Sequence, residues 1–443
     1  MLHYIKQRIP NWMKAPYHWA LAWLSALVYG FPSDKLVVIG VTGTNGKSST
    51  IQFIAQMLEH LGQQVGYTGT AGFYVNGRVM ENKLKMTMPG RFFLQRLLRD
   101  MVRAGCRYAL VETTSQGIEQ FRHLGINYDV VVFTNLTPEH IESHGGFENY
   151  KAAKGKLFAH LTSRKHKTFG DELVEKVSVI NADDPHAPFF LSFPADRTIR
   201  FSWDQGAQSD DWYVVKSAAQ DTSGLPIHIN GVAGMIPLQA LFEQRNAVAA
   251  FATVRALGFD MRATLEAMAT LHSLPGRFEL VDEGQDFHVI VDYAYEPFAL
   301  EALLNAVDRL TGHRRVIGVH GSCGGGRDIA RRDKIGRLAG LREDIVVVTN
   351  EDPYDEDPRC IIEAVANGAR AAGKMEGEDL FLIDDRMEAI EYAIGVAQPG
   401  DVVLVTGKGS ETVMAVAGGK KAPWSDREAA RQALRRRLAR ASV

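Results

Sequence analysis

Residues 40–50 read Gly-Val-Thr-Gly-Thr-Asn-Gly-Lys-Ser-Ser-Thr. An apolar run, Leu36–Val41, leads into this stretch, and an amphipathic run, Ile51–Leu61, follows it. The pattern therefore predicts a buried strand, a glycine-rich turn and a helix, which together form a phosphate-binding loop. The spacing departs from the usual loop at one position, because Val41 stands where the first glycine would be.

Each residue type in this turn has a physical task. Glycines let successive backbone N–H groups face phosphate oxygens, and the helix N-terminus adds partial positive charge. We expect Lys47 to reach the terminal phosphates of a nucleoside triphosphate and Ser48 to ligate Mg²⁺. The residues expected to bind the nucleotide here are Gly43, Thr44, Asn45, Gly46, Lys47, Ser48 and Ser49.

Beyond the loop, short apolar runs alternate with longer amphipathic stretches, which is typical of βαβ units and parallel sheets. The expected strands are Leu36–Val41, Tyr108–Val111, Val130–Phe133 and Val177–Ile180, then Val289–Val291, Val316–Val319, Ile345–Val348 and Val402–Val405. The fold class is therefore α/β, with a P-loop central domain on a mostly parallel sheet and a C-terminal Rossmann-like α/β domain.

We place the domain boundaries at three points along the chain. Residues 1–35 form an aromatic helical segment, 36–271 the central P-loop ATPase domain, and 272–443 the C-terminal domain. Between Arg200 and Pro237 the apolar residues are sparse and alternate roughly, which predicts a smaller β-rich insertion.

Composition narrows the function classes. The 443 residues exceed what one hydrophobic core usually organises. Because 50 Lys+Arg stand against 52 Asp+Glu, no global basic field exists to gather nucleic acid. Cys106, Cys323 and Cys360 form no C-x-x-C pair, which argues against a disulfide framework or a zinc knuckle. We expect a cytoplasmic protein without a nucleic-acid partner.

The aromatic segment 15–31 is almost uncharged and follows a basic start with Lys6, Arg8 and Lys14. It has fewer than the roughly 20 residues needed to span a bilayer, and it has no clear cleavage site. Two interpretations stay open. The segment is either a helix docked on the body or an interfacial helix in weak contact with a membrane or a partner.

More polar residues follow the predicted strands. Glu112 opens Glu-Thr-Thr-Ser at 112–115, where its carboxylate could hold the magnesium that Ser48 approaches. The next strand ends in Thr-Asn-Leu-Thr-Pro-Glu-His at 134–140. Three side chains then recur at helical spacing: Tyr150, Lys154 and Phe158.

Together these segments resemble the Mur ligase family, and most closely its branch that adds the third amino acid to UDP-N-acetylmuramoyl-dipeptide. The matching segments occur in the family's order over roughly residues 36–430: Val-Thr-Gly-Thr-Asn-Gly-Lys-Ser at 41–48, Glu-Thr-Thr-Ser at 112–115, Thr-Asn-Leu-Thr-Pro-Glu-His at 134–140, Tyr150-x-x-Ala153-Lys154, Asn181-Ala182-Asp183-Asp184, Gly276-Arg277-Phe278-Glu279, Val291-Asp292-Tyr293-Ala294 and Gly407-Lys408-Gly409-Ser410-Glu411.

The resemblance implies a role for each matching residue. Lys47, Glu112, His140 and Lys154 are the catalytic residues, and Ser48, Glu112, His140 and Lys154 hold two Mg²⁺ ions. Lys154 matches the family's carbamylated lysine, in which added CO₂ turns a cation into an oxygen ligand. Asn246 lies on the adenine side, while Arg277 and Asp292 bind phosphate and ribose. The muramyl-peptide nucleotide is bound by Thr87, Ser115, Gln120 and Arg122.

The implied reaction is ATP-dependent amide-bond formation in peptidoglycan precursor synthesis. A substrate carboxylate takes the γ-phosphate of ATP to become an acyl phosphate, and the amine of an amino acid then displaces that phosphate. Both substrates are small molecules, and we expect the enzyme to act as a monomer.

The chain departs from the family at several points, among them Tyr295-Glu296 and Ser410 in motifs that otherwise match, and two departures bear on its substrates. Only about 36 residues precede the first strand, too few for the domain that holds uridine in Mur enzymes, so we expect that domain to be missing. Members that add diaminopimelate carry Asp-Asn-Pro-Arg, where this chain has Glu351-Asp352-Pro353-Tyr354. Diaminopimelate thereby loses a guanidinium clamp. Four carboxylates could instead receive an ammonium, as in lysine or ornithine, or remain solvated: Glu351, Asp352, Asp355 and Glu411.

Two other functions stay open. The chain resembles folylpolyglutamate synthetases in beginning near its P-loop, so its donor could be a non-muramyl carboxylate. Alternatively, it is a catalytically silent ATP-binding scaffold of wall synthesis. The sequence does not identify the amino acid that is added.

Overall fold

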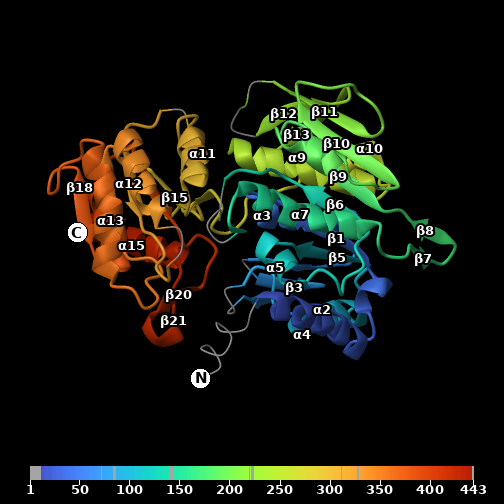
Figure 1. Ribbon diagram of the computed structural model, residues 1–443. Coiled ribbons are helices and arrows are strands. Elements are labelled where there is room, and N and C mark those ends of the chain that lie inside the picture. Colours follow the sequence, from blue (N-terminus) through green and yellow to red (C-terminus); the bar gives the residue numbers. More distant parts are fainter. Residues whose placement is uncertain are drawn as a thin grey trace. The chain divides into compact units, whose positions relative to one another are not determined.

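The computed structural model describes residues 11–70, 72–82, 86–138, 144–218, 220, 224–310, 312–326 and 329–441. The chain divides into two compact units, Met1–His272 and Ser273–Val443 (Figure 1). Among the described residues, no helix has the length and hydropathy of a membrane-spanning segment.

The first unit is built on an eleven-stranded sheet of described residues, in the order β13-β12-β11-β10-β9-β6-β1-β5-β2-β3-β4. The strands from β11 to β2 run parallel, and the two edges turn antiparallel. Their bounds are β1 Val37–Thr42, β2 Val65–Thr68, β3 Gly72–Val75, β4 Arg78–Glu81, β5 Tyr108–Glu112, β6 Val130–Phe133, β9 Val177–Asn181, β10 Arg197–Trp203, β11 Trp212–Ser217, β12 Leu225–Ile229 and β13 Val232–Ile236.

The central strands lie deep in the core. Every residue of β1, β5 and β6 is buried, which explains why they are continuous apolar runs rather than alternating ones. At Gly40 in β1, a Cβ would lie 2.6 Å from the Tyr128 ring, so glycine lets that aromatic side chain cross the strand. The expected strands of this half are confirmed.

Helices connect these strands. Their bounds are α2 Asn11–Val28, η1 Pro32–Lys35, α3 Lys47–His60, α4 Arg91–Arg103, α5 Ser115–Glu119, α7 Phe147–Leu161, α8 Ala187–Leu191, α9 Leu241–Ala256 and α10 Met261–Met268. Helix α3 packs against α9, and α2 packs against α4 (Figure 1). A small hairpin, β7 Lys167–Phe169 with β8 Glu172–Val174, connects α7 to β9.

The β-rich segment expected between Arg200 and Pro237 is present, but it is not a separate insertion. Strand β10 pairs in parallel with β9, β11 pairs in parallel with β10, and β12 and β13 complete the same sheet as antiparallel strands. The segment therefore extends the sheet up to α9, which begins five residues after β13 ends.

The second unit contains a six-stranded sheet of described residues, in the order β14-β15-β19-β16-β17-β18. All pairs are parallel except β14 with β15, so the expected second α/β sheet is confirmed. Its strands are β14 Glu279–Leu280, β15 His288–Asp292, β16 Val316–His320, β17 Ile345–Thr349, β18 Leu380–Ile383 and β19 Val402–Thr406. The other elements are α11 Pro297–Val307, α12 Ala330–Arg342, α13 Pro358–Ala371, α14 Arg386–Val396, α15 Asp426–Ala441, η2 Ala417–Gly419 and the hairpin β20 Val413–Val416 with β21 Lys420–Pro423.

Candidate active site

The predicted phosphate-binding loop joins β1 to α3. Gly46 stands directly before the helix with φ of 81°, and no described side chain caps the helix N-terminus. The first N–H groups of α3 are therefore available to an anion, where the helix dipole also favours negative charge.

Two glycines of this loop allow close approach of other side chains. A Cβ at Gly43 would lie 1.9 Å from Thr134 Oγ1, and a Cβ at Gly46 would lie 2.1 Å from Asn246 Oδ1. The amide of Asn246, on α9, thus rests directly on the loop, although about 200 residues separate the two in sequence. Asn246 was expected on the adenine side of the nucleotide, and the structure places it beside the phosphate loop.

Replacing Gly46 by alanine should weaken ATP binding by about tenfold or more, because the new Cβ overlaps Asn246 and a left-handed backbone costs an L residue about 1–2 kcal/mol. Gly62 provides the control, since its φ is 75° and a Cβ there would have no atom of the described residues within 4 Å. Titration of ATP into both variants shows whether the loss belongs to the loop position, and the stability of Gly62→Ala reports the backbone cost alone. Equal affinities would contradict the placement of Asn246.

Lys47 lies in the first turn of α3 and folds back on the loop. Its ammonium donates to the carbonyl oxygens of Gly43 at 3.1 Å and Thr44 at 2.6 Å. No carboxylate pairs with it among the described residues, so its charge is available for a phosphate.

Ser48 and Glu112 meet at the carboxyl edge of β1 and β5. Ser48 Oγ donates to Glu112 Oε2 at 2.8 Å, and the N–H of Thr70 donates to the same oxygen at 2.9 Å. Glu112 is only 1% exposed, and within the described ranges only neutral groups donate to its carboxylate. A buried carboxylate whose hydrogen-bond donors are neutral hydroxyl and amide groups is suited to binding a divalent cation. Mg²⁺ in particular prefers oxygen ligands.

Lys154 reaches the loop from α7 and contacts the same carbonyl oxygen as Lys47. It is 1% exposed, its Nζ donates to the carbonyl oxygen of Gly43 at 2.7 Å, and it lies 4.4 Å from the centroid of the Tyr150 ring. Tyr150 OH in turn lies 3.2 Å from Thr44 Oγ1. Lys154 is thus placed at the phosphate loop. His140, predicted as a second metal ligand, lies outside the described residues.

Two residues predicted to bind the donor lie close to this centre. Thr87 Oγ1 is 3.0 Å from Thr70 Oγ1, which also contacts Glu112. Ser115 begins α5, where Thr114 caps the helix by accepting the N–H of Gly117, and Ser115 Oγ lies 3.1 Å from His144 Nε2.

Arg91 and Arg122 form a cationic pair that Gln120 links by accepting from both. Arg122 donates to Gln120 Oε1 at 2.6 Å and to the carbonyl of Met88, and Arg91 donates to the carbonyl of Gln120. Burial, and then the neighbouring Arg91, lower the pKa of Arg122 to about 10. Two part-buried guanidinium groups held by neutral acceptors form a favourable site for a carboxylate or phosphate.

The second unit brings Arg277 and Asp292 together. Asp292 accepts the N–H groups of Phe278 and Ala294, both at 2.7 Å, and burial raises its pKa while Arg277 opposes that rise. Arg277 lies 4.4 Å from the centroid of the Tyr293 ring. A Cβ at Gly276 would lie 2.1 Å from Ser410 N, so the Gly-Arg-Phe-Glu and Gly-Lys-Gly-Ser-Glu segments touch backbone to backbone.

Glu411 belongs to a buried charged network. Lys408 donates to Asp352 at 3.0 and 3.1 Å and also to Glu411, and Tyr293 OH donates to Glu411 at 3.1 Å. Glu351, beside this network, accepts from Cys323 Sγ at 3.0 Å, but its Oε2 is buried and has no hydrogen-bond partner among the described residues. Burial raises the pKa of Glu351, and Arg331 opposes the rise.

Sequence reasoning missed two residues of the first unit. Thr70 bridges Ser48, Glu112 and Thr87, and Arg91 doubles the charge beside Arg122. Thr70 could have been found from topology, because it follows β2 and β2 neighbours β5. Nothing in the sequence around Arg91 indicated its contact with Gln120.

Comparison with known proteins adds independent findings. Residues 41–254 match the Mur ligase middle domain, and residues 276–409 match the Mur ligase glutamate ligase domain. The chain is 38% identical to the UDP-N-acetylmuramoyl-L-alanyl-D-glutamate–2,6-diaminopimelate ligase of Geobacillus thermodenitrificans, over 94% of this chain and 83% of that protein. It is 37% identical to the UDP-N-acetylmuramyl-tripeptide synthetase of a Roseiflexus species, over 94% and 82%. A solved diaminopimelate ligase of the same description aligns with a TM-score of 0.59 and 29% identity, over 91% of this chain and 79% of that one.

Proposed function

The chain belongs to the Mur ligase family of ATP-dependent amide-bond ligases, and on that premise we propose that it joins an amino acid to a UDP-N-acetylmuramoyl-peptide in peptidoglycan precursor synthesis. The single observation that carries this assignment to the residues is the buried Glu112 carboxylate, which accepts from Ser48 at the phosphate loop and has only neutral donors in the described structure. A desolvated carboxylate at this place is costly unless a cation balances it, which is the task of the magnesium that accompanies ATP.

The residues divide the work of the reaction among them. Lys47 and the N–H groups of α3 hold the phosphates of ATP, and Ser48 and Glu112 would hold Mg²⁺, which neutralises phosphate charge. Arg91 and Arg122 bind the acidic donor, so that its carboxylate is positioned despite its repulsion from ATP. The carboxylate takes the γ-phosphate, the amine attacks the acyl carbon, and phosphate leaves.

Three further roles belong to this proposal. Lys154 would carry a carbamate that supplies a metal ligand, and His140 would supply another. Asn246 contacts the adenine side, and Arg277 and Asp292 of the second unit bind phosphate and ribose. Thr87, Ser115 and Gln120 contact the donor, and Glu411 lies on the amine side. We place the activity in the cytoplasm, where ATP is available and where the three free cysteines, all described, stay reduced.

The direct test supplies the protein with ATP, Mg²⁺, UDP-N-acetylmuramoyl-L-alanyl-D-glutamate and a pool of amino acids, and identifies the product by mass spectrometry. We expect a product heavier than the donor by one amino acid less one water, with one ADP formed for each bond. Folate-type and other acids serve as alternative donors in parallel reactions. A product from one of these alone would replace the muramyl assignment, and ADP without any condensed product would refute ligation.

The incoming amine is expected to be lysine or ornithine, used with a kcat/KM at least about tenfold higher than diaminopimelate. Residues 351–354 are Glu-Asp-Pro-Tyr, and the buried Glu351 Oε2 faces the Cα of Gly407, where a Cβ would lie only 2.4 Å away. Binding a second carboxylate of the amino acid substrate beside Glu351 is disfavoured, because like charges repel. Binding a side-chain ammonium there is favoured.

Competition between equimolar amino acids, with both products weighed, measures this preference. In the variant Glu351→Gln the preference should fall, while Asp355→Asn, at a solvent-facing neighbour in the same turn, should keep it. Faster use of diaminopimelate by the unaltered protein would show that the substitution of tyrosine for arginine is compensated elsewhere.

A further inference from the structure

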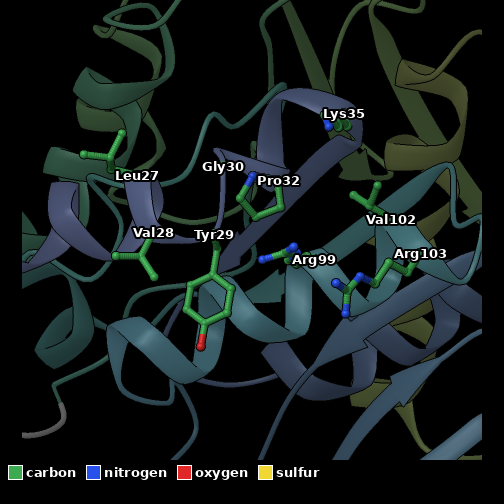
Figure 2. Close-up of a pocket in the computed structure, with 9 residues that line it drawn as sticks. All are labelled: Leu27, Val28, Tyr29, Gly30, Pro32, Lys35, Arg99, Val102 and Arg103. Carbon is green, nitrogen blue, oxygen red and sulfur yellow. The ribbon is translucent and has the colours of Figure 1, made fainter.

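A pocket of about 430 Å³ lies beside the C-terminal end of α2, on the first unit (Figure 2). It is lined by the end of α2, by η1 and by α4: Leu27, Val28, Tyr29, Gly30, Pro32, Lys35, Arg99, Val102 and Arg103. Its volume is that of a small-molecule site. None of these residues belongs to the nucleotide, donor or amine sites described above.

One side of α2 fastens the helix to the body. Ala22, Ser25 and Ala26 are buried, and α2 packs against α4. A Cβ at Gly125 would lie 2.7 Å from the carbonyl oxygen of Ala22, so glycine there permits close contact. The helix is therefore docked on the body through small residues, and this side of the helix is buried against the protein.

The opposite side of α2 is apolar and exposed. Tyr17, Leu24 and Val28 follow the spacing i, i+7, i+11, which places them along one stripe of the helix. They are 59%, 48% and 56% exposed, and Leu27, at the flank of the stripe, is 63% exposed. The stripe ends at the pocket, because Leu27 and Val28 also line it. This face has no covering element among the described residues.

Three cations surround the pocket next to this apolar stripe. Lys35 and Arg103 are exposed, Arg99 is part-buried, and none of them has an ion-pair partner in the part of the chain that the structure describes. In Figure 2 the guanidinium groups of Arg99 and Arg103 extend from α4 toward the side on which Tyr29 lies. By contrast, arginines of α15 are neutralised, since Arg435 pairs with Glu283 and Arg436 with Glu391.

We propose that the α2 stripe and this pocket form a docking site for an anionic membrane surface, with a phospholipid headgroup held by Lys35, Arg99 and Arg103 and the apolar stripe lying at the acyl boundary. An apolar helix face flanked by cations binds the interface in this way, through buried apolar area and attraction to anionic lipid. The chain has no Asp or Glu before Asp34, so its N-terminal charge is entirely positive.

Other occupants fit less well. A free phosphate would satisfy the three cations but would leave the exposed Leu24, Leu27 and Val28 unexplained. A second copy of the chain in a symmetric contact would set the same unpaired cations against one another, which is repulsive. A bilayer surface is apolar and anionic together, and so it is complementary to both features.

The experiment is flotation of the full chain with vesicles of 70% phosphatidylcholine and 30% phosphatidylglycerol, compared with vesicles of phosphatidylcholine alone, at about 0.1 M salt. The protein should float with the anionic vesicles and much less with the neutral ones. Each cation near an anionic surface contributes about fivefold to binding, so Lys35→Ser/Arg99→Ser/Arg103→Ser should lower the partition by about 100-fold. Leu24→Ser/Leu27→Ser should also release the protein, because it removes the apolar part.

The matched control is Lys216→Ser/Arg262→Ser/Lys420→Ser, which removes three exposed cations elsewhere and causes the same change in net charge. It should float like the unaltered protein, and ligase turnover without vesicles should be unchanged in every variant. Equal loss of flotation in both triple variants would overturn the proposal, as would the absence of flotation with anionic vesicles. Binding of glycerophosphate without vesicle binding would assign a small-anion site instead, and concentration-dependent dimerisation abolished by the leucine variant would assign the stripe to a second copy.

Discussion

Replacing Lys47 by alanine is expected to lower ligation turnover by about 1,000-fold or more, because losing one charge that stabilises a transferring phosphoryl group costs on that order. The structure gives this lysine no carboxylate partner among the described residues, and its ammonium lies on the carbonyls of Gly43 and Thr44 at the loop. Its charge is therefore balanced only when phosphate is bound. ADP release, measured with saturating donor and amine, reports the loss.

Lys156 is a suitable control for this variant. It lies on α7, its ammonium is 3.5 Å from Glu119, and its side chain is 57% exposed, so Lys156→Ala removes a charge of low energetic value. Turnover in Lys156→Ala should stay within about twofold of the unaltered protein. If Lys47→Ala kept more than a tenth of its activity, the loop would bind its nucleotide differently from the arrangement proposed here.

Replacing Lys154 by alanine is expected to lower turnover by about 100-fold to 1,000-fold, and to abolish any dependence on bicarbonate. Lys154 is 1% exposed and donates to the carbonyl oxygen of Gly43, so its side chain ends at the phosphate loop. Carbamylation requires the neutral amine to attack CO₂, which forms an N–C bond and releases one proton. Activity of the unaltered protein should therefore rise with added bicarbonate.

The control for Lys154 lies on the same helix. Lys151 is one turn earlier on α7 and pairs with Glu148 at 2.6 Å, so Lys151→Ala should keep both turnover and the bicarbonate response. Formate should partly restore Lys154→Ala, since it supplies a carboxylate in the space that the side chain leaves. A ¹³C carbamate signal from labelled bicarbonate, present in the unaltered protein and missing in Lys154→Ala, is the readout that a merely structural lysine would not produce. Full activity without bicarbonate would end the carbamate assignment.

The strands and the phosphate loop could be predicted from sequence because their signals are local. Continuous apolar runs such as Val130–Phe133 indicate strands buried on both faces, and glycines followed by lysine and serine indicate the turn. The resemblance then assigned roles to residues far apart in the chain, such as Asn246, which the structure places on Gly46.

What could not be predicted depends on pairing and on the reach of side chains. Nothing local in Arg197–Trp203 shows that it pairs with β9 rather than starting a separate sheet, because a strand's partner is not encoded in its own alternation. Likewise, the hydrogen bond from Arg91 to Gln120 depends on how α4 lies relative to α5. The contact of Thr70 with Glu112 could be predicted only if the pairing of β2 with β5 were known. These are tertiary facts, and local patterns carry little information about them.

The continuity of the large sheet affects how this protein can be recombined with its relatives. Strands β9 to β13 are successive neighbours in the sheet and are followed in the chain by α9, which packs on α3 and places Asn246 against Gly46. A chimaera with crossovers at residues 200 and 237 would cut β10 within its pairing with β9. It would also join strands β11 to β13 of the other parent to α9 of this one. Breakpoints at the start of β9 and after α10 would keep the ladders from β9 to β13 within one parent, and should yield more folded hybrids where the β6–β9 pairing and the packing of α9 on α3 are preserved.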